Sequence, residues 1–174
     1  MSPIPLIIDC DPGVDDAVAL LLAFAVPDAL EVVAVTTTAG NVDGPQTARN
    51  ARLIRQIAGR EDVPVHAGAE VPLVRPPIGA GHFHGESGLG DLPVFEPDAP
   101  AAPGHAVEAI VALVMSRPSG TVRLAVTGPM TNLALALRKE PRLAAHLGPV
   151  VAMGGARAGA PRGRPGRGSP SRRP

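Results

Sequence analysis

A cluster of four aspartates after the first apolar segment limits what this chain can fold into. Residues 4–8 form a short apolar run, and a Pro12-Gly13 pair and a second apolar run over residues 17–26 follow it. The aspartates between these runs are Asp9, Asp11, Asp15 and Asp16. The pattern predicts a strand, an acidic turn and a helix in that order. It therefore places the aspartates at the carboxyl end of a strand, where open α/β sheets bind ligands. Because close like charges repel, we expect a hard cation among them.

Helix capping is the alternative role for Asp15 and Asp16. Carboxylates in the first turn of a helix are stabilised by roughly 0.3–1 kcal/mol each. Capping does not explain Asp9 and Asp11, which alternate along the strand and are expected to point together while Cys10 points away. Metal or substrate binding is therefore the favoured interpretation.

Apolar runs of strand length alternate with helical patterns along the rest of the chain. We predict strands at 4–8, 31–38, 63–67, 122–127 and 149–153, and helices at 15–26, 43–58, 106–115 and from 132 onward. A Pro- and Gly-rich loop over 68–104 has the length of an active-site cover or a disordered segment. The alternation predicts an α/β fold with an open, mostly parallel sheet and helices on both faces.

Charge divides the sequence into two parts. Residues 1–155 hold 10 Lys and Arg against 16 Asp and Glu, and we assign them to one domain. Residues 156–174 contain six Arg and no acid, and their Ala, Arg, Gly, Pro and Ser composition predicts a disordered tail. With one cysteine, expected to be a small buried hydrophobe, and no signal-like or membrane-spanning apolar run, the sequence predicts a cytoplasmic protein without membrane partners.

The composition of the tail permits two explanations. All five of its residue types have GC-rich codons, and a frame one base away from 169–174 could encode Pro-Val-Ala-Glu-Ala, so we favour a frameshifted translation. The competing explanation is a basic nucleic-acid-binding arm. The absence of Lys and aromatic residues disfavours that arm, so no nucleic-acid partner is predicted.

The residues from 9 to 23, DCDPGVDDAVALLLA, resemble the N-terminal signature of the inosine–uridine-preferring nucleoside hydrolases. Six further stretches agree in order: 34–42 (AVTTTAGNV), 48–53 (ARNARL), 63–68 (VPVHAG), 80–90 (AGHFHGESGLG), 125–134 (AVTGPMTNLA) and 150–156 (VVAMGGA). The resemblance implies a Rossmann-like nucleoside hydrolase fold in truncated form, and Ca²⁺ as the cofactor.

The same resemblance implies roles for individual residues. Asp11, Asp16 and the Thr127 backbone carbonyl correspond to Ca²⁺ ligands, and Asp11 is also the candidate general base. Asp15 and Asn41 correspond to ribose contacts. Asp9 is similar to an acid that orients the site from behind. An ordinary turn with a helix cap from Thr131 or Asn132 is the alternative for 127–132.

Histidines in the long loop have less specific patterns. His82 and His84 are two residues apart, which does not match a zinc motif, and no helix is predicted there. A solvated loop histidine is the alternative to a functional one. The resemblance places His82 near the nucleobase or sugar, in a catalytic or binding role, with His84 second. His66 and His105 are expected to be structural.

The implied reaction is hydrolysis of the N-glycosidic bond of purine or pyrimidine ribonucleosides, giving ribose and a free base. The preferred base is not evident from the sequence. The family also contributes later residues that this chain does not match, so a remnant that only binds metal or ribose is the alternative. A metal-dependent phosphohydrolase using Asp9 and Asp11 is a weaker one, because Pro12-Gly13 follows the acidic pair. Relatives of this kind imply a homodimer or homotetramer.

Overall fold

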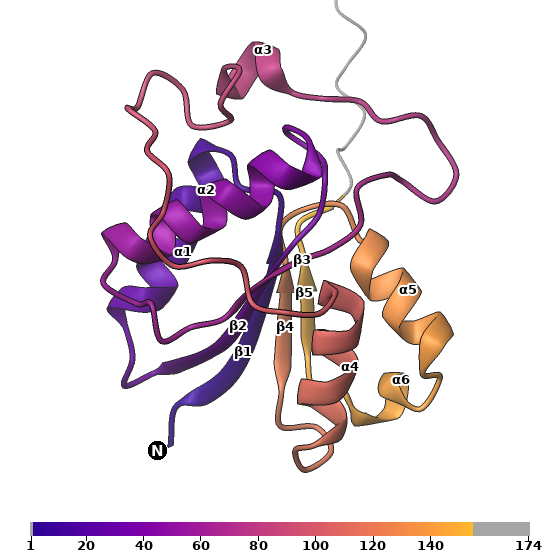
Figure 1. Ribbon diagram of the computed structural model, residues 1–174. Helices are drawn as coiled ribbons and strands as arrows, with labels where there is room; N and C mark the ends of the chain where they lie inside the picture. The colour runs from indigo at the N-terminus through magenta and orange to yellow at the C-terminus, as the bar shows by residue number, and fades with distance from the viewer. Residues whose placement is uncertain (1, 155–174) are drawn as a thin grey trace, which may run out of the picture.

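A computed structural model describes residues 2–154, which form one parallel sheet with helices on both faces (Figure 1). The strands are β1 (Ile4–Cys10), β2 (Leu30–Thr37), β3 (Val65–Ala67), β4 (Arg123–Val126) and β5 (Val150–Ala152). The helices are α1 (Val14–Ala25), α2 (Gly44–Ile57), α3 (Gly81–His84), α4 (Ala106–Met115), α5 (Thr131–Lys139) and α6 (Leu143–His146). The strand order is β3-β2-β1-β4-β5, and every described pairing is parallel. The predicted α/β fold is confirmed.

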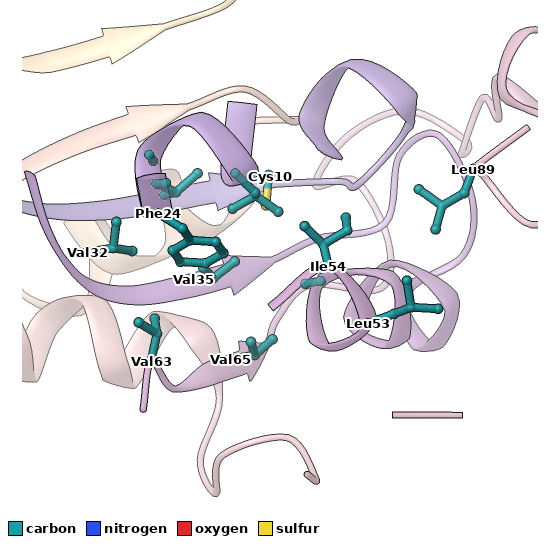
Figure 2. Close-up of a cluster of buried hydrophobic side chains, with 13 residues drawn as sticks. Cys10, Phe24, Val32, Val35, Leu53, Ile54, Val63, Val65 and Leu89 are labelled. Carbon is teal, nitrogen blue, oxygen red and sulfur yellow. The ribbon is translucent and has the colours of Figure 1, made fainter. Parts of the chain in front are cut away.

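Two hydrophobic cores lie on opposite faces of the sheet. The first packs α1 and α2 against β1–β3, and Figure 2 shows Cys10, Phe24, Val35, Ile54 and Val65 within it. The second packs α4, α5 and α6 against β1 and β4. Successive residues of β1 point to opposite faces, so Ile7 enters the second core and Ile8 the first. Cys10 is fully buried, as its expected role as a small hydrophobe requires.

Side-chain caps explain where two of the helices begin. Asp43 precedes α2, and its side chain accepts a hydrogen bond from the Gln46 backbone N–H at 2.9 Å. His105 does the same for α4 by accepting from the Val107 N–H at 3.2 Å, which confirms its expected structural role.

Two four-residue helices, α3 and α6, were not predicted. The expectation that no helix surrounds His82 and His84 is wrong, because α3 covers both residues. Helix α1 begins at Val14, and Asp15 and Asp16 lie in its first turn as predicted. Elements of one turn carry no periodic apolar pattern, so sequence spacing cannot reveal them.

The predicted long loop crosses over the carboxyl ends of β1 and β2. The Ala39 N–H donates to the Ala69 carbonyl at 2.8 Å, and the Ala80 N–H donates to the Asn41 carbonyl at 3.0 Å. The loop is thereby tied to the turn that follows β2. The predicted tail, 156–174, lies outside the described residues. Within 2–154, none of the helices combines the length and apolar character needed to cross a bilayer.

Candidate functional site

A cavity of about 350 Å³ opens at the carboxyl ends of the central strands. Its lining residues come from the turns after β1, β2, β4 and β5 and from the first turn of α1. They are Asp11, Asp15, Asn41, Thr127, Gly128, Pro129, Met130, Met153 and Gly154. The structure therefore brings together four of the predicted site residues: Asp11, Asp15, Asn41 and Thr127. They converge because carboxyl ends of parallel strands share one edge of the sheet.

Asp11 is held in place by the turn after β2. The Asn41 backbone N–H donates to Asp11 Oδ2 at 2.8 Å, and the Asn41 side-chain Nδ2 donates to the Asp11 carbonyl at 2.9 Å. Glycines allow this close packing: a Cβ at Gly128 would lie 2.7 Å from Asp11 Oδ1, and one at Gly40 would clash with Oδ2. The pKa of Asp11 is raised to about 7, mainly by burial and also by the nearby charge of Asp16, while the hydrogen bond from Asn41 opposes the rise.

Asp16 caps the start of α1 through one of its two carboxylate oxygens. Its Oδ2 accepts a hydrogen bond from the Gly13 N–H at 3.2 Å, which is the capping role at the start of α1. Its Oδ1 is buried without a hydrogen-bond partner among the described residues, and so is the hydroxyl of Thr127. Burial raises the pKa of Asp16, while the neighbouring Thr127 hydroxyl opposes that shift. Capping thus accounts for one carboxylate oxygen and leaves the other free for a ligand.

The side chain of Asp9 does not line the cavity. It is fully buried, and its Oδ1 accepts from Thr36 Oγ1 at 2.7 Å and from Asn132 Nδ2 at 2.8 Å. Burial raises its pKa to about 6, and these two hydrogen bonds oppose the rise. A phosphohydrolase that uses Asp9 as nucleophile is disfavoured, because the side chain does not line the cavity.

Asp15 and His84 face each other at the rim of the site. Asp15 is exposed, and its Oδ1 lies 4.0 Å from His84 Nδ1. His84 Nδ1 also accepts a long hydrogen bond, 3.4 Å, from the Val14 N–H. His84 therefore contacts the acidic turn. The side chain of His82 lies outside the described part of the structure.

Sequence reasoning missed two buried asparagines that hold the site together. Asn132 donates to Asp9 and to the Thr37 carbonyl, and its Oδ1 accepts from the Ala69 N–H at 2.9 Å. It is therefore a link between strand ends, and not the helix cap considered for it. Asn50 donates to the carbonyls of Pro12 at 3.1 Å and Ser87 at 2.8 Å. The only sequence signal for Asn50 is a polar residue on the apolar face of a predicted helix.

A cation ringed by four aspartates is not what the structure shows. Among residues 2–154, no group of three or more His, Cys, Asp or Glu side chains is arranged to hold a metal ion. Asp9 is engaged elsewhere and Asp15 is at the rim, which leaves two buried carboxylates, Asp11 and Asp16. A site for a hard cation here therefore needs further oxygen donors, such as backbone carbonyls or water.

Comparison with known proteins gives a consistent result. The profile of the "Inosine-uridine preferring nucleoside hydrolase" family matches residues 6–169. The Crithidia fasciculata protein of that name is 47% identical over 154 residues, which are 88% of this chain and 49% of the relative. A Photobacterium profundum "Pyrimidine-specific ribonucleoside hydrolase RihA" is 47% identical over 87% of this chain and 48% of its own length.

Solved structures agree with the sequence matches. A plant nucleoside hydrolase superimposes with a TM-score of 0.83 at 36% identity, covering 88% of this chain and 48% of the plant protein. An inosine-guanosine nucleoside hydrolase gives 0.78 at 37% identity, over 87% and 49%. This chain therefore spans about half the length of the relatives that it matches.

Proposed function

The chain belongs to the inosine–uridine preferring nucleoside hydrolase family, and from this premise we propose that its cavity hydrolyses the N-glycosidic bond of ribonucleosides. The products are ribose and a free purine or pyrimidine base. The observation that carries the proposal is the position of Asp11, a buried carboxylate at the cavity wall that is fixed by Asn41.

Asp11 is proposed as the general base. A general base must lie at the cavity in its ionised form, and Asp11 lines the cavity. In the metal-free chain burial raises the pKa of Asp11 to about 7, and a bound cation would keep the carboxylate ionised. The hydrogen bond from the Asn41 N–H to Oδ2 fixes the carboxylate, so that Oδ1 accepts the proton of a water molecule in the cavity. That water then attacks C1′ of the ribose as the bond to the base breaks, through a transition state with oxocarbenium character.

Ca²⁺ is the proposed cofactor, and the donor set fits it. The ligands would be Asp11, Asp16 and the Thr127 carbonyl, all of them the hard oxygen donors that Ca²⁺ prefers. The buried Asp16 Oδ1 supports this, because it accepts no hydrogen bond among the described residues and is available to a cation. When bound, Ca²⁺ would polarise water and the ribose hydroxyls.

Ribose recognition is assigned to the rim of the cavity. Asp15 is exposed and lines the cavity, so its carboxylate is available to accept hydrogen bonds from ribose hydroxyls. Asn41 lies beside Asp11 and is proposed as a second sugar contact. His82 is proposed to lie near the base or sugar, as the resemblance to the family implies. His84 lies beside Asp15 and is proposed to contact the same part of the substrate.

A protein that binds metal or ribose without turnover is the second candidate. The observation that favours it is the exposure of Met130 and Met153, which line the cavity yet are open to solvent. Water entering from that side would weaken every electrostatic interaction in the site.

Product analysis separates the two candidates. The 174-residue chain is incubated with inosine or uridine and Ca²⁺, and the sugar product is identified by chromatography. Hydrolysis gives free ribose and the free base in equal amounts. Binding of ribose or Ca²⁺ without either product supports the second candidate, and absence of both binding and products contradicts the proposal.

A further inference from the structure

The side-chain amide of Asn50 joins two segments that carry site residues. Asn50 lies in the middle of α2 and is fully buried. Its Nδ2 donates to the Pro12 carbonyl at 3.1 Å and to the Ser87 carbonyl at 2.8 Å, and its Oδ1 accepts from Gln46 Nε2 at 2.8 Å. Because only the NH₂ end of the amide can donate to two carbonyls, these partners determine the orientation of the side chain and use both of its N–H groups.

Ser87 belongs to a closed turn of the long loop, which spans residues 84–90. The Gly90 N–H donates to the His84 carbonyl at 2.7 Å and thereby joins the two ends of the turn. Leu89 anchors the turn, because its side chain is buried in the first core. A hydrogen bond to Ser87 therefore also fixes the position of His84, at the start of the same turn.

Gly88 lets the 84–90 turn approach Asn50 closely. Its φ of +82° lies in the left-handed region, which disfavours residues with a side chain. A Cβ at this position would lie 2.9 Å from Asn50 Nδ2 and 3.3 Å from the Pro12 carbonyl oxygen. The backbone of the turn thus packs directly on the amide and on the acidic turn after β1.

His84 has only weak contacts of its own with the acidic turn. Its Nδ1 accepts the Val14 N–H at 3.4 Å and lies 4.0 Å from Asp15 Oδ1. A hydrogen bond of that length is weak, and an ion pair at a partly exposed position contributes little. The shorter hydrogen bonds of the Asn50 amide are therefore the stronger connection between the two segments.

We propose that Asn50 is a positioning residue, whose amide holds the 84–90 turn against the acidic turn and so keeps His84 beside Asp15 at the rim of the cavity. Its effect on turnover rests on the proposed function, in which both of these side chains contact the substrate. Without the amide, the turn also occupies positions in which His84 has moved away from Asp15. The apparent affinity for substrate then falls in proportion to the fraction of molecules in which the ring is in place.

Amide hydrogen exchange, followed residue by residue by NMR, tests the proposal without depending on turnover. Asn50→Leu keeps the shape of the side chain and removes both donors. Gly88→Ala leaves α2 unaltered and adds a Cβ that meets the amide from the loop side. Gly90→Ala is the matched control, because Gly90 has a φ of +64° in the same turn but its Cβ would lie 3.8 Å from a methyl carbon of Val14, an ordinary contact.

The loop is expected to open locally. In Asn50→Leu, exchange of the amides in the 84–90 turn should rise by about tenfold more than exchange of the amides in β1 and β2. Gly88→Ala should raise exchange in the turn by about tenfold more than Gly90→Ala, because it adds a clash to the same backbone strain. Exchange that rises equally in the turn and the core strands of Asn50→Leu would indicate a merely structural asparagine and overturn the proposal. Equal effects of the two glycine variants would overturn it as well.

Ribose release from inosine provides a second readout. KM is expected to rise by about tenfold in Asn50→Leu and Gly88→Ala while kcat falls by less than about threefold, because fewer molecules hold His84 in place. A fall in kcat with an unchanged KM contradicts a role in substrate binding. Local opening of the turn in a chain that releases no ribose supports the positioning role of Asn50 while counting against the proposed function.

Discussion

Asn132 Nδ2 lies 2.8 Å from Asp9 Oδ1, which joins the first turn of α5 to the end of β1 across 123 residues of sequence. The same amide group also donates to the Thr37 carbonyl at 2.9 Å. One asparagine therefore holds together the ends of two adjacent strands and the start of a helix. The cavity is built on this support, because Asp11 follows β1 directly and Asn41 lies in the turn after β2.

Asn132→Ala is expected to destabilise the fold by about 3 kcal/mol, because it leaves a buried carbonyl and a buried N–H without partners. Urea unfolding followed by circular dichroism measures the change. Gln56→Ala is the control, since Gln56 exchanges hydrogen bonds with Asp98 at an exposed position and should cost less than about 1 kcal/mol. Equal losses for the two variants would contradict the role given to Asn132.

Stability is expected to fall as the pH rises from about 4 to about 7 in calcium-free buffer. Burial raises the pKa of Asp9 from 3.8 to about 6 and that of Asp11 from 3.8 to about 7. Between the unfolded and folded values the folded chain binds more protons, so the free energy of unfolding decreases with pH. Above the pKa values of the folded chain both carboxyl groups are ionised, and the free energy of unfolding falls no further from this cause.

Asp9→Asn isolates one part of this pH dependence. The amide oxygen of Asn still accepts from Thr36 and Asn132, but the group no longer ionises. The rise in the pKa of Asp9 from 3.8 to about 6 corresponds to about 3 kcal/mol. Between about pH 4 and pH 7 the free energy of unfolding should therefore fall by about 3 kcal/mol less in the variant than in the wild-type chain. Urea unfolding at the two ends of the range measures the difference. Identical pH profiles for the variant and the wild-type chain would show that Asp9 does not titrate as described.

Asp16→Asn should weaken Ca²⁺ binding by about tenfold or more, because it removes a charged ligand. The Asn side chain can still accept the Gly13 N–H, so the start of α1 is preserved. Isothermal titration calorimetry measures the affinity, and the rise in Tm on adding Ca²⁺ provides a second readout. Asp28→Asn is the control at an exposed acid on the opposite end of the sheet. Unchanged affinity in Asp16→Asn would remove Asp16 from the proposed ligands.

Gly40→Ala should abolish measurable Ca²⁺ binding and ribose release. The added Cβ would clash with Asp11 Oδ2 and push the carboxylate out of place. Gly79→Ala is the control, because its Cβ would lie 3.7 Å from the Asn41 carbonyl, an ordinary contact. Both variants are assayed for ribose release and for Ca²⁺ affinity. Wild-type values in Gly40→Ala would mean that the placement of Asp11 beside Gly40 is unimportant.

Sequence reasoning located the parts of the site that are local. The acidic turn follows an apolar strand directly, and Asn41 and Thr127 lie at the ends of other strands, so parallel topology alone brings them together. The α/β fold followed from the same alternation of patterns. The sequence did not show that Asp9 is fully buried and bonded to Asn132, because alternation along a strand does not reveal the partner on each face.

The missed residues depend on contacts between distant segments. Asn132 bonds to Asp9, and Asn50 bonds to Pro12 and Ser87, and neither pairing leaves a periodic trace in the sequence. The position of His84 beside Asp15 depends on the path of the long loop over the turn. Such a path is set by many weak contacts, such as the Ala80 N–H to Asn41 carbonyl bond, and not by a motif.

The role of Asp11 as general base is tested by release of ribose from inosine and uridine, measured for the wild-type chain beside Asp11→Asn in saturating Ca²⁺. We expect ribose release by the wild-type chain and a rate roughly 10²–10⁴-fold lower in the variant, the usual cost of losing a general base. Asp28→Asn should keep the wild-type rate. No release by the wild-type chain, or equal rates for it and Asp11→Asn, would contradict the assignment of Asp11 as the base of a nucleoside hydrolase.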